Sequence, residues 1–149
     1  MKLRGLLFGL LILLLVAASF VLPACSTTTA SNLTEPPFAS QITENLLLAV
    51  NAGDYSAFSK DFDASLIKAL PAQSFPKQFT GGIQGKIGNY QANSKRFFQA
   101  SSQAQFITVI YYAVYSMEPG AVLIQISFTI VEGRPLVSGL FFNSPKLRG

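Results

Sequence analysis

The stretch Ala121–Val131, AVLIQISFTIV, decides the fold because its side chains alternate between apolar and polar. Successive side chains of an extended strand point to opposite faces, so a period of two predicts a strand with one buried face. The apolar series is Val122, Ile124, Ile126, Phe128 and Ile130, and the polar series is Gln125, Ser127 and Thr129. The alternation therefore predicts a strand that lies with one side on a hydrophobic core.

Three more strands are predicted around this one, at residues 90–99, 104–115 and 136–142. The links between the strands are short and rich in turn-forming residues, which favours an antiparallel meander; they are 100–102, 118–120 and 132–135. The segment 104–115 is apolar on both faces, with Phe106, Ile110, Tyr112 and Val114 on one and Ile107, Val109, Tyr111 and Tyr115 on the other. One face must meet helices, and the other is either covered by a partner or left as an exposed patch.

Upstream of the strands the apolar residues recur with the helical period. A first helix carries the stripe Ile42, Leu46, Leu47, Ala49 and Val50, and Gly53 is placed to end it in the left-handed conformation. Asp54 and Asp63 are placed to cap two short helices, and residues 74–87 are predicted as a fourth helix. Helices followed by strands predict an α+β domain, with N-terminal helices packed on a curved four-stranded antiparallel sheet.

Several short motifs of the domain resemble a known family. They are Gly53-Asp54-Tyr55, Phe62-Asp63, Gly85-Lys86-Ile87-Gly88 and Ser138-Gly139-Leu140. Over residues 39–142 the chain resembles the domain of unknown function numbered 3887, found in bacterial and archaeal lipoproteins. The resemblance implies a nuclear-transport-factor-two-like, or cystatin-like, cone of helices on a curved sheet. It implies no established activity and no catalytic residues.

The N-terminus has the features of an export signal. Lys2 and Arg4 precede an apolar run from Leu6 to Leu22, and the one cysteine of the chain, Cys25, follows directly after Ala24. Leu22-Pro23-Ala24-Cys25 resembles the bacterial lipobox, which implies cleavage between Ala24 and Cys25 and lipidation of the thiol. The alternatives are an uncleaved membrane helix and a cysteine that merely follows a signal cut elsewhere.

These features divide the chain into four parts. Residues 1–24 are the predicted signal peptide, and residues 25–37 are the lipidated cysteine and a flexible, small and polar tether. Residues 38–143 are the α+β domain, and residues 144–149 are a C-terminal tail. We expect a protein anchored by its lipid at the extracytoplasmic face of the cell membrane or envelope.

The composition offers little for catalysis. The chain has no histidine, and its seven carboxylates fall in the tether, in the first helix (Glu44), near helix ends and in turns, so we expect no catalytic residue, no metal and no cofactor. Of the 11 basic side chains Lys2 and Arg4 lie in the signal peptide, which leaves 9 against 7 acidic ones. This near-neutral balance does not indicate nucleic-acid binding.

We therefore expect a binding or interaction module rather than an enzyme. Its partner is a small apolar ligand or another protein. The residues predicted to line a pocket or an interaction surface are Phe106, Tyr111, Tyr112, Tyr115 and Phe128, and the alternative is that these rings are ordinary core and sheet-surface residues. Two other functions stay open: an assembly protein that forms homodimers through the sheet, and an enzyme with a buried carboxylate of raised pKa.

Overall fold

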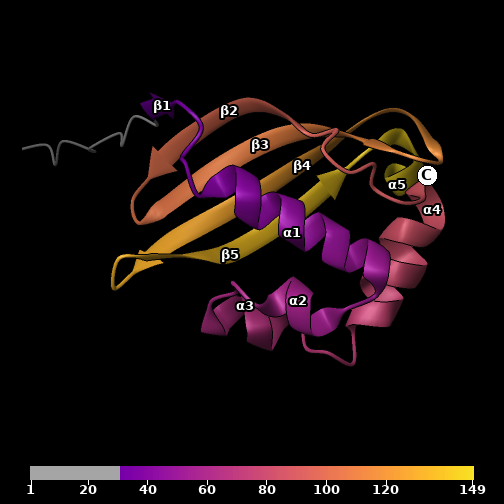
Figure 1. Ribbon diagram of the computed structural model, residues 1–149, viewed down its shortest axis with the longest axis horizontal. Coiled ribbons are helices and arrows are strands. Elements are labelled where there is room, and N and C mark those ends of the chain that lie inside the picture. The colour runs from indigo at the N-terminus through magenta and orange to yellow at the C-terminus, as the bar shows by residue number, and fades with distance from the viewer. Residues whose placement is uncertain (1–30) are drawn as a thin grey trace, which may run out of the picture.

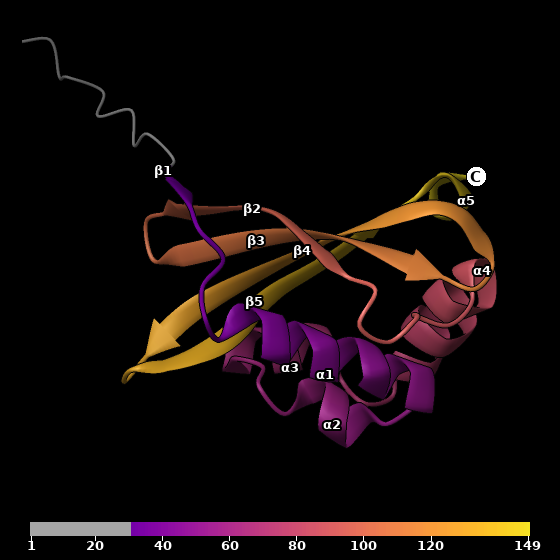
Figure 2. The same cartoon turned by 45° about the horizontal axis from the view of Figure 1, so that its top comes forward.

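A computed structural model describes residues 31–149. The predicted signal peptide 1–24, its cleavage site at Ala24 and the lipidation site Cys25 lie outside the described residues. The fold is α+β, with helices on one side of an antiparallel sheet (Figures 1 and 2). The sequence prediction of this class is therefore confirmed.

The sheet has the strand order β1-β2-β3-β4-β5, and every neighbouring pair is antiparallel. The strands are β1 (Ser31–Leu33), β2 (Arg96–Gln103), β3 (Phe106–Tyr115), β4 (Glu118–Val131) and β5 (Arg134–Asn143). β2 to β5 form the predicted meander, and β1 adds a short strand at its edge. In the β4–β5 turn Glu132 and Gly133 both have positive φ, 51° and 77°, which suits the right-handed twist of a tight hairpin.

The helices precede the meander, except for one at the C-terminus. They are α1 (Ala39–Ala52), α2 (Tyr55–Ser59), α3 (Ala64–Ala69), the π-helical η1 (Pro76–Gln84), α4 (Gly85–Ile87) and α5 (Pro145–Arg148). Gly53 ends α1 with φ 68°, and the carboxylates of Asp54 and Asp63 accept hydrogen bonds from the backbone of α2 and α3. These three predictions are confirmed, because each rests on a signal within a few residues of the helix end.

The core lies between the helices and the inner face of the sheet. Leu47 of α1 and Val109, Ile124 and Ile126 of the sheet are all fully buried. Beneath α2 and η1 an aromatic cluster of Phe58, Phe62, Phe75 and Phe79 packs with centroid distances of 4.6 to 5.5 Å. Burial of each such side chain stabilises the fold by about 1.5–3 kcal/mol before the entropy cost of ordering is counted.

The first predicted strand was wrong at both ends. β2 starts at Arg96 rather than at residue 90 and continues through the predicted link 100–102. Its hairpin turn is at Ala104, which has φ 53°, a conformation that sequence rules assign to glycine or asparagine. The link predicted at 118–120 is likewise part of β4, because the turn falls at residues 116–117 instead.

The domain extends beyond the predicted range 38–143 at both ends. The tether was predicted to run to residue 37, but β1 pairs with β2 and Glu35 bonds to Tyr111, so residues 31–37 lie against the domain. The segment 144–149 was predicted as a tail, but Ser144 caps α5 and Leu147 packs on the core. The pairing of β1, the bond of Glu35 and the packing of Leu147 all involve residues distant in sequence, which local composition does not reveal.

Candidate binding surface

The face of the sheet that points away from the helices is open (Figure 2). We call it the outer face. The strand register places Phe106, Tyr112, Val114 and Phe141 on it, and the ring of Phe98, at a bulge of β2, packs on Tyr112 with a centroid distance of 5.2 Å. The exposed fractions of these side chains run from 38% to 55%. Single exposed apolar residues are ordinary, but several on one uncovered sheet face are typical of an interaction surface.

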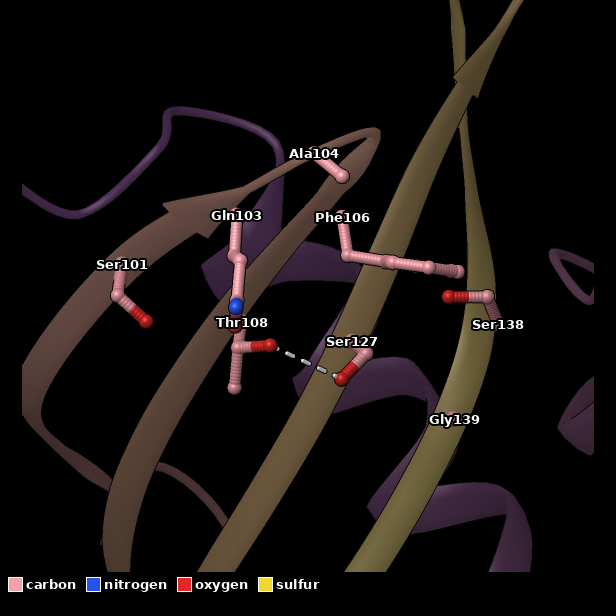
Figure 3. A pocket seen from close by; sticks show the side chains of 8 residues that line it. All are labelled: Ser101, Gln103, Ala104, Phe106, Thr108, Ser127, Ser138 and Gly139. Atoms are coloured by element: carbon pink, nitrogen blue, oxygen red, sulfur yellow. Dashed lines mark hydrogen bonds between the residues drawn. The ribbon is translucent and has the colours of Figure 1, made fainter. Parts of the chain in front are cut away.

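A hollow of about 450 Å³ lies on this face over the middle strands (Figure 3). Its lining is uncharged, and half of the lining residues carry a hydroxyl: Ser101, Gln103, Ala104, Phe106, Thr108, Ser127, Ser138 and Gly139. Hydroxyl and amide groups can donate or accept hydrogen bonds, while the Phe106 ring offers an apolar wall. The hollow therefore suits an uncharged ligand group or peptide segment.

Gly139 lines the hollow and, having no side chain, leaves space open there. It lies opposite Ser127 in the register, and a Cβ on it would lie 3.4 Å from the Ser127 Cβ. Beside the hollow's floor Thr108 Oγ1 and Ser127 Oγ share a hydrogen bond of 3.1 Å (Figure 3). Ser138, which precedes Gly139, lies at a bulge of β5, and its buried hydroxyl has no hydrogen-bond partner within residues 31–149. A buried hydroxyl without a partner is costly, so a ligand or water that bonds to it gains free energy.

The residues that we predicted to form one site do not meet. Phe106 and Tyr112 lie on the outer face, at 40% and 38% exposure, whereas Tyr111, Tyr115 and Phe128 are buried on the inner face. The predicted group is therefore split by the sheet, because β3 is apolar on both sides. Only Phe106 lines the hollow.

Sequence reasoning missed the hydroxyl-bearing residues of the hollow. Ser101, Thr108 and Ser127 each occupy an outward position of an alternating strand, as ordinary solvent-facing residues do. They become neighbours only through the register Ser101–Thr108–Ser127–Gly139 across four strands. Ser138-Gly139 was the one part with a local signal, since glycine within a strand often marks a bulge or a close approach.

A second polar cluster lies on the inner side, around Glu44 of α1. Its carboxylate accepts hydrogen bonds from Tyr90 Oη at 2.8 Å, the Asn93 backbone N–H at 2.9 Å and Lys95 Nζ at 2.8 Å. Burial would raise the pKa of Glu44, but these hydrogen bonds outweigh it and hold the pKa below its ordinary value. Burial, and then the bond to Glu44, raises the pKa of Tyr90 to about 12.

Two further carboxylates are engaged by the domain. Glu35 Oε1 accepts a hydrogen bond of 2.6 Å from Tyr111 Oη, and burial together with this bond raises the pKa of Tyr111. Glu118 is 5% exposed, and a hydrogen bond from the Ser144 hydroxyl lowers its pKa. Glu35 and Glu118 thus hold chain segments together through hydrogen bonds, which is a structural arrangement.

A third feature is an apolar hollow of about 270 Å³ between η1, β5 and α5. Its apolar lining residues are Leu70, Phe79, Ile83, Leu140, Phe141, Phe142 and Leu147. It is smaller than the hollow of the outer face, and its walls are side chains that also pack on the core. It is the place on the domain where a small apolar ligand fits best.

No family model, curated protein or solved structure matches the chain. Within residues 31–149 no group of three or more histidine, cysteine or acidic side chains is arranged to hold a metal ion. Among the helices of that same range, none has the length and hydrophobicity of a membrane span.

Proposed function

We propose that this protein is an envelope lipoprotein, anchored through a lipid on Cys25, whose domain is a non-catalytic binding module. The observation that carries the binding role is the outer face, where an uncharged, hydroxyl-lined hollow lies among exposed aromatic side chains. The lipobox-like Leu22-Pro23-Ala24-Cys25 and the apolar run before it support the anchor. Helices on one face of an antiparallel sheet are also compatible with a nuclear-transport-factor-two-like relationship.

The chemistry of the outer face favours a protein partner with an uncharged segment. Phe98, Tyr112 and Phe141 offer apolar area, and the hollow offers hydroxyl and amide groups for backbone hydrogen bonds. The register places Arg96 at one edge of this face and no carboxylate on its rows from Arg96 to Leu136. A partner segment with a lysine or arginine would therefore find no carboxylate to pair with on this part of the outer face.

The apolar hollow beside η1 supports a second candidate, a small apolar ligand. Its lining of leucine, isoleucine and phenylalanine resembles the walls of ligand pockets, but Gln78 is the one polar residue that could orient a ligand there. An enzyme with a buried base of raised pKa is less well supported. Glu44 is committed to three hydrogen bonds, and the pKa values of Glu44 and Glu118 are lowered.

Site-specific photo-crosslinking in the native host tests the proposed surface. A photoreactive phenylalanine at Phe141 of the outer face, 55% exposed, should capture a discrete partner protein. The matched control places the same residue at Ile67 of α3, 46% exposed on the helical side, and should not capture it. Capture of the partner from both positions, or from neither, contradicts the proposal. Capture of a second copy of the chain alone supports the assembly role instead.

Two glycine substitutions test whether capture of the partner at Phe141 depends on the hollow. Gly139→Val projects a side chain into the hollow and should reduce capture at Phe141. Gly120→Val, on the same sheet, places its Cβ where no atom lies within 4 Å and should leave capture unchanged. Equal capture by both variants would show that the hollow is not part of the interface.

A further inference from the structure

The hairpin of β4 and β5 projects beyond the rest of the sheet (Figure 1). β3 begins at Phe106, opposite Thr129, so the pairs Ile130–Pro135 and Val131–Arg134 have no third strand beside them. We call these four residues the overhang. Ile130 and Val131 are 47% and 48% exposed, and adjacent strand residues point to opposite faces, so the overhang carries an exposed apolar side chain on each side.

The chain enters the domain from the same end. Ser31, Ser102, Ile107, Phe128 and Val137 form one row across the five strands. β1 is antiparallel to β2 and Ser31 lies opposite Ser102, so the described chain begins at the end of the sheet where the hairpin tips lie. Val131 is three residues past Phe128 on that side, about 10 Å at the rise of a strand.

The length of chain outside the structure then limits where a membrane can be. Six residue steps separate Cys25 from Ser31, and even a fully extended chain covers only about 20 Å over that number. A lipid on Cys25 would therefore keep the tip end of the sheet within about 20 Å of the bilayer surface. The opposite end of the sheet lies farther away, since Val114 is seven residues from Ile107, or about 23 Å along β3.

We infer that the overhang contacts the bilayer surface and that the anchored domain stands on the membrane with the tip end of its sheet. This inference rests on the proposed lipid anchor. The side chains suit the interface, since Ile130, Val131 and the half-exposed Phe106 can enter the boundary between headgroups and acyl chains. Arg134, which pairs with Val131, lies beside them for lipid phosphates. The lipid supplies the affinity, and the overhang sets the orientation.

A single tryptophan can report this contact, because the chain has none. Val131→Trp and Val114→Trp are a matched pair: both valines lie on strands, are exposed by 48% and 49%, and occupy opposite ends of the sheet. Each acylated full-length variant is placed on phosphatidylcholine–phosphatidylglycerol vesicles with and without bromine on the acyl chains. We expect the emission of Val131→Trp to fall about twofold with brominated lipid and that of Val114→Trp to stay unchanged. Phe106→Trp, which exchanges one ring for another at the same end, repeats the test if Val131→Trp does not fold.

The other outcomes each contradict a different statement. If the acylated protein does not rise with the vesicles in a flotation assay, the lipid anchor of the proposed function is contradicted. A protein that floats with neither tryptophan quenched contradicts the contact, and quenching of both shows a domain lying flat on its outer face. A concentration-dependent blue shift of Val131→Trp without vesicles would assign the overhang to a second copy of the chain instead.

Discussion

The hydroxyl of Tyr90 donates a hydrogen bond of 2.8 Å to Oε2 of Glu44, although 46 positions separate the two residues. The same carboxylate is paired with Lys95 at 2.8 Å, and both side chains of that pair are 10% exposed. Glu44 thus fastens α1 to the segment that leads into β2. Because β2 carries part of the hollow, this inner-face cluster also holds the outer face in place.

Substitution of Glu44 by glutamine should lower the free energy of unfolding at pH 7 by about 2–4 kcal/mol, because it leaves the Lys95 ammonium buried without its counter-charge. The pKa of Glu44 is lowered by folding, so its contribution is present above the unfolded pKa near 4.5 and is lost as the pH falls below it. Urea denaturation should therefore show a difference between wild type and Glu44→Gln that shrinks from pH 7 to pH 3. The exposed Glu132→Gln serves as control and should change stability little at either pH; equal losses in both variants would contradict the prediction.

The bond between Tyr111 and Glu35 should hold residues 31–37 on the domain. Tyr111→Phe removes a hydrogen bond to a charged group and should cost about 1–2 kcal/mol. Glu35→Gln weakens the same bond, so the double variant should lose clearly less than the sum of the two single losses. Chemical denaturation of the four proteins measures this coupling. Faster hydrogen exchange at β1 in the single variants would show the release of the segment, and additive losses would mean that the bond contributes nothing.

Asp63 should contribute to stability as the N-cap of α3. Its carboxylate accepts a 2.7 Å hydrogen bond from the Leu66 backbone N–H, and Asp63→Ala should cost about 1 kcal/mol. Asp63→Asn keeps an acceptor and should lose much less. Asp61→Ala, two residues earlier and outside the cap, is the control for loss of a negative charge. Urea denaturation that ranks Asp61→Ala as the more harmful change would refute the capping role.

Local signals explain what the sequence predicted correctly. The cap positions of Asp54 and Asp63 and the alternation of β4 each depend on residues only a few positions apart. The β2–β3 turn was missed because Ala104 adopts a positive φ without any glycine or asparagine to indicate it. The position of that turn is set by tertiary contacts, which override local propensity.

The hollow and the attachment of Glu35 depend on contacts between residues that are distant in sequence. Ser127 and Gly139 become neighbours through a register that includes a bulge at Ser138, and Glu35 meets Tyr111 across 76 positions. A single sequence contains no direct signal for either contact. The aromatic residues of β3 were recognised as important, but only the register shows that Tyr111 and Tyr112 serve opposite faces of the sheet.

Gly88 should be the glycine that tolerates substitution least. It has φ 81° and ψ −161°, a region that side chains rarely adopt, and a Cβ there would lie 2.8 Å from Met117 N and 2.9 Å from Met117 Cγ, with Ser116 Oγ also in its way. Gly88→Ala should therefore cost about 3 kcal/mol or more, from backbone strain and steric overlap together. Gly120→Ala has no atom within 4 Å of the new Cβ and should stay within about 0.5 kcal/mol of wild type.

Thermal and urea unfolding of Gly88→Ala and Gly120→Ala measure the difference. Adding Ser116→Ala to Gly88→Ala separates the two causes, because it removes the Oγ overlap and leaves the positive φ. Partial recovery in that double variant is expected, since the Met117 backbone still opposes the Cβ. Ser116→Ala alone is the control, because it also removes the hydrogen bond that Asn89 N–H donates to Ser116 Oγ. A Gly88→Ala protein as stable as Gly120→Ala would mean that the 88–89 and 116–117 segments do not pack as closely as described.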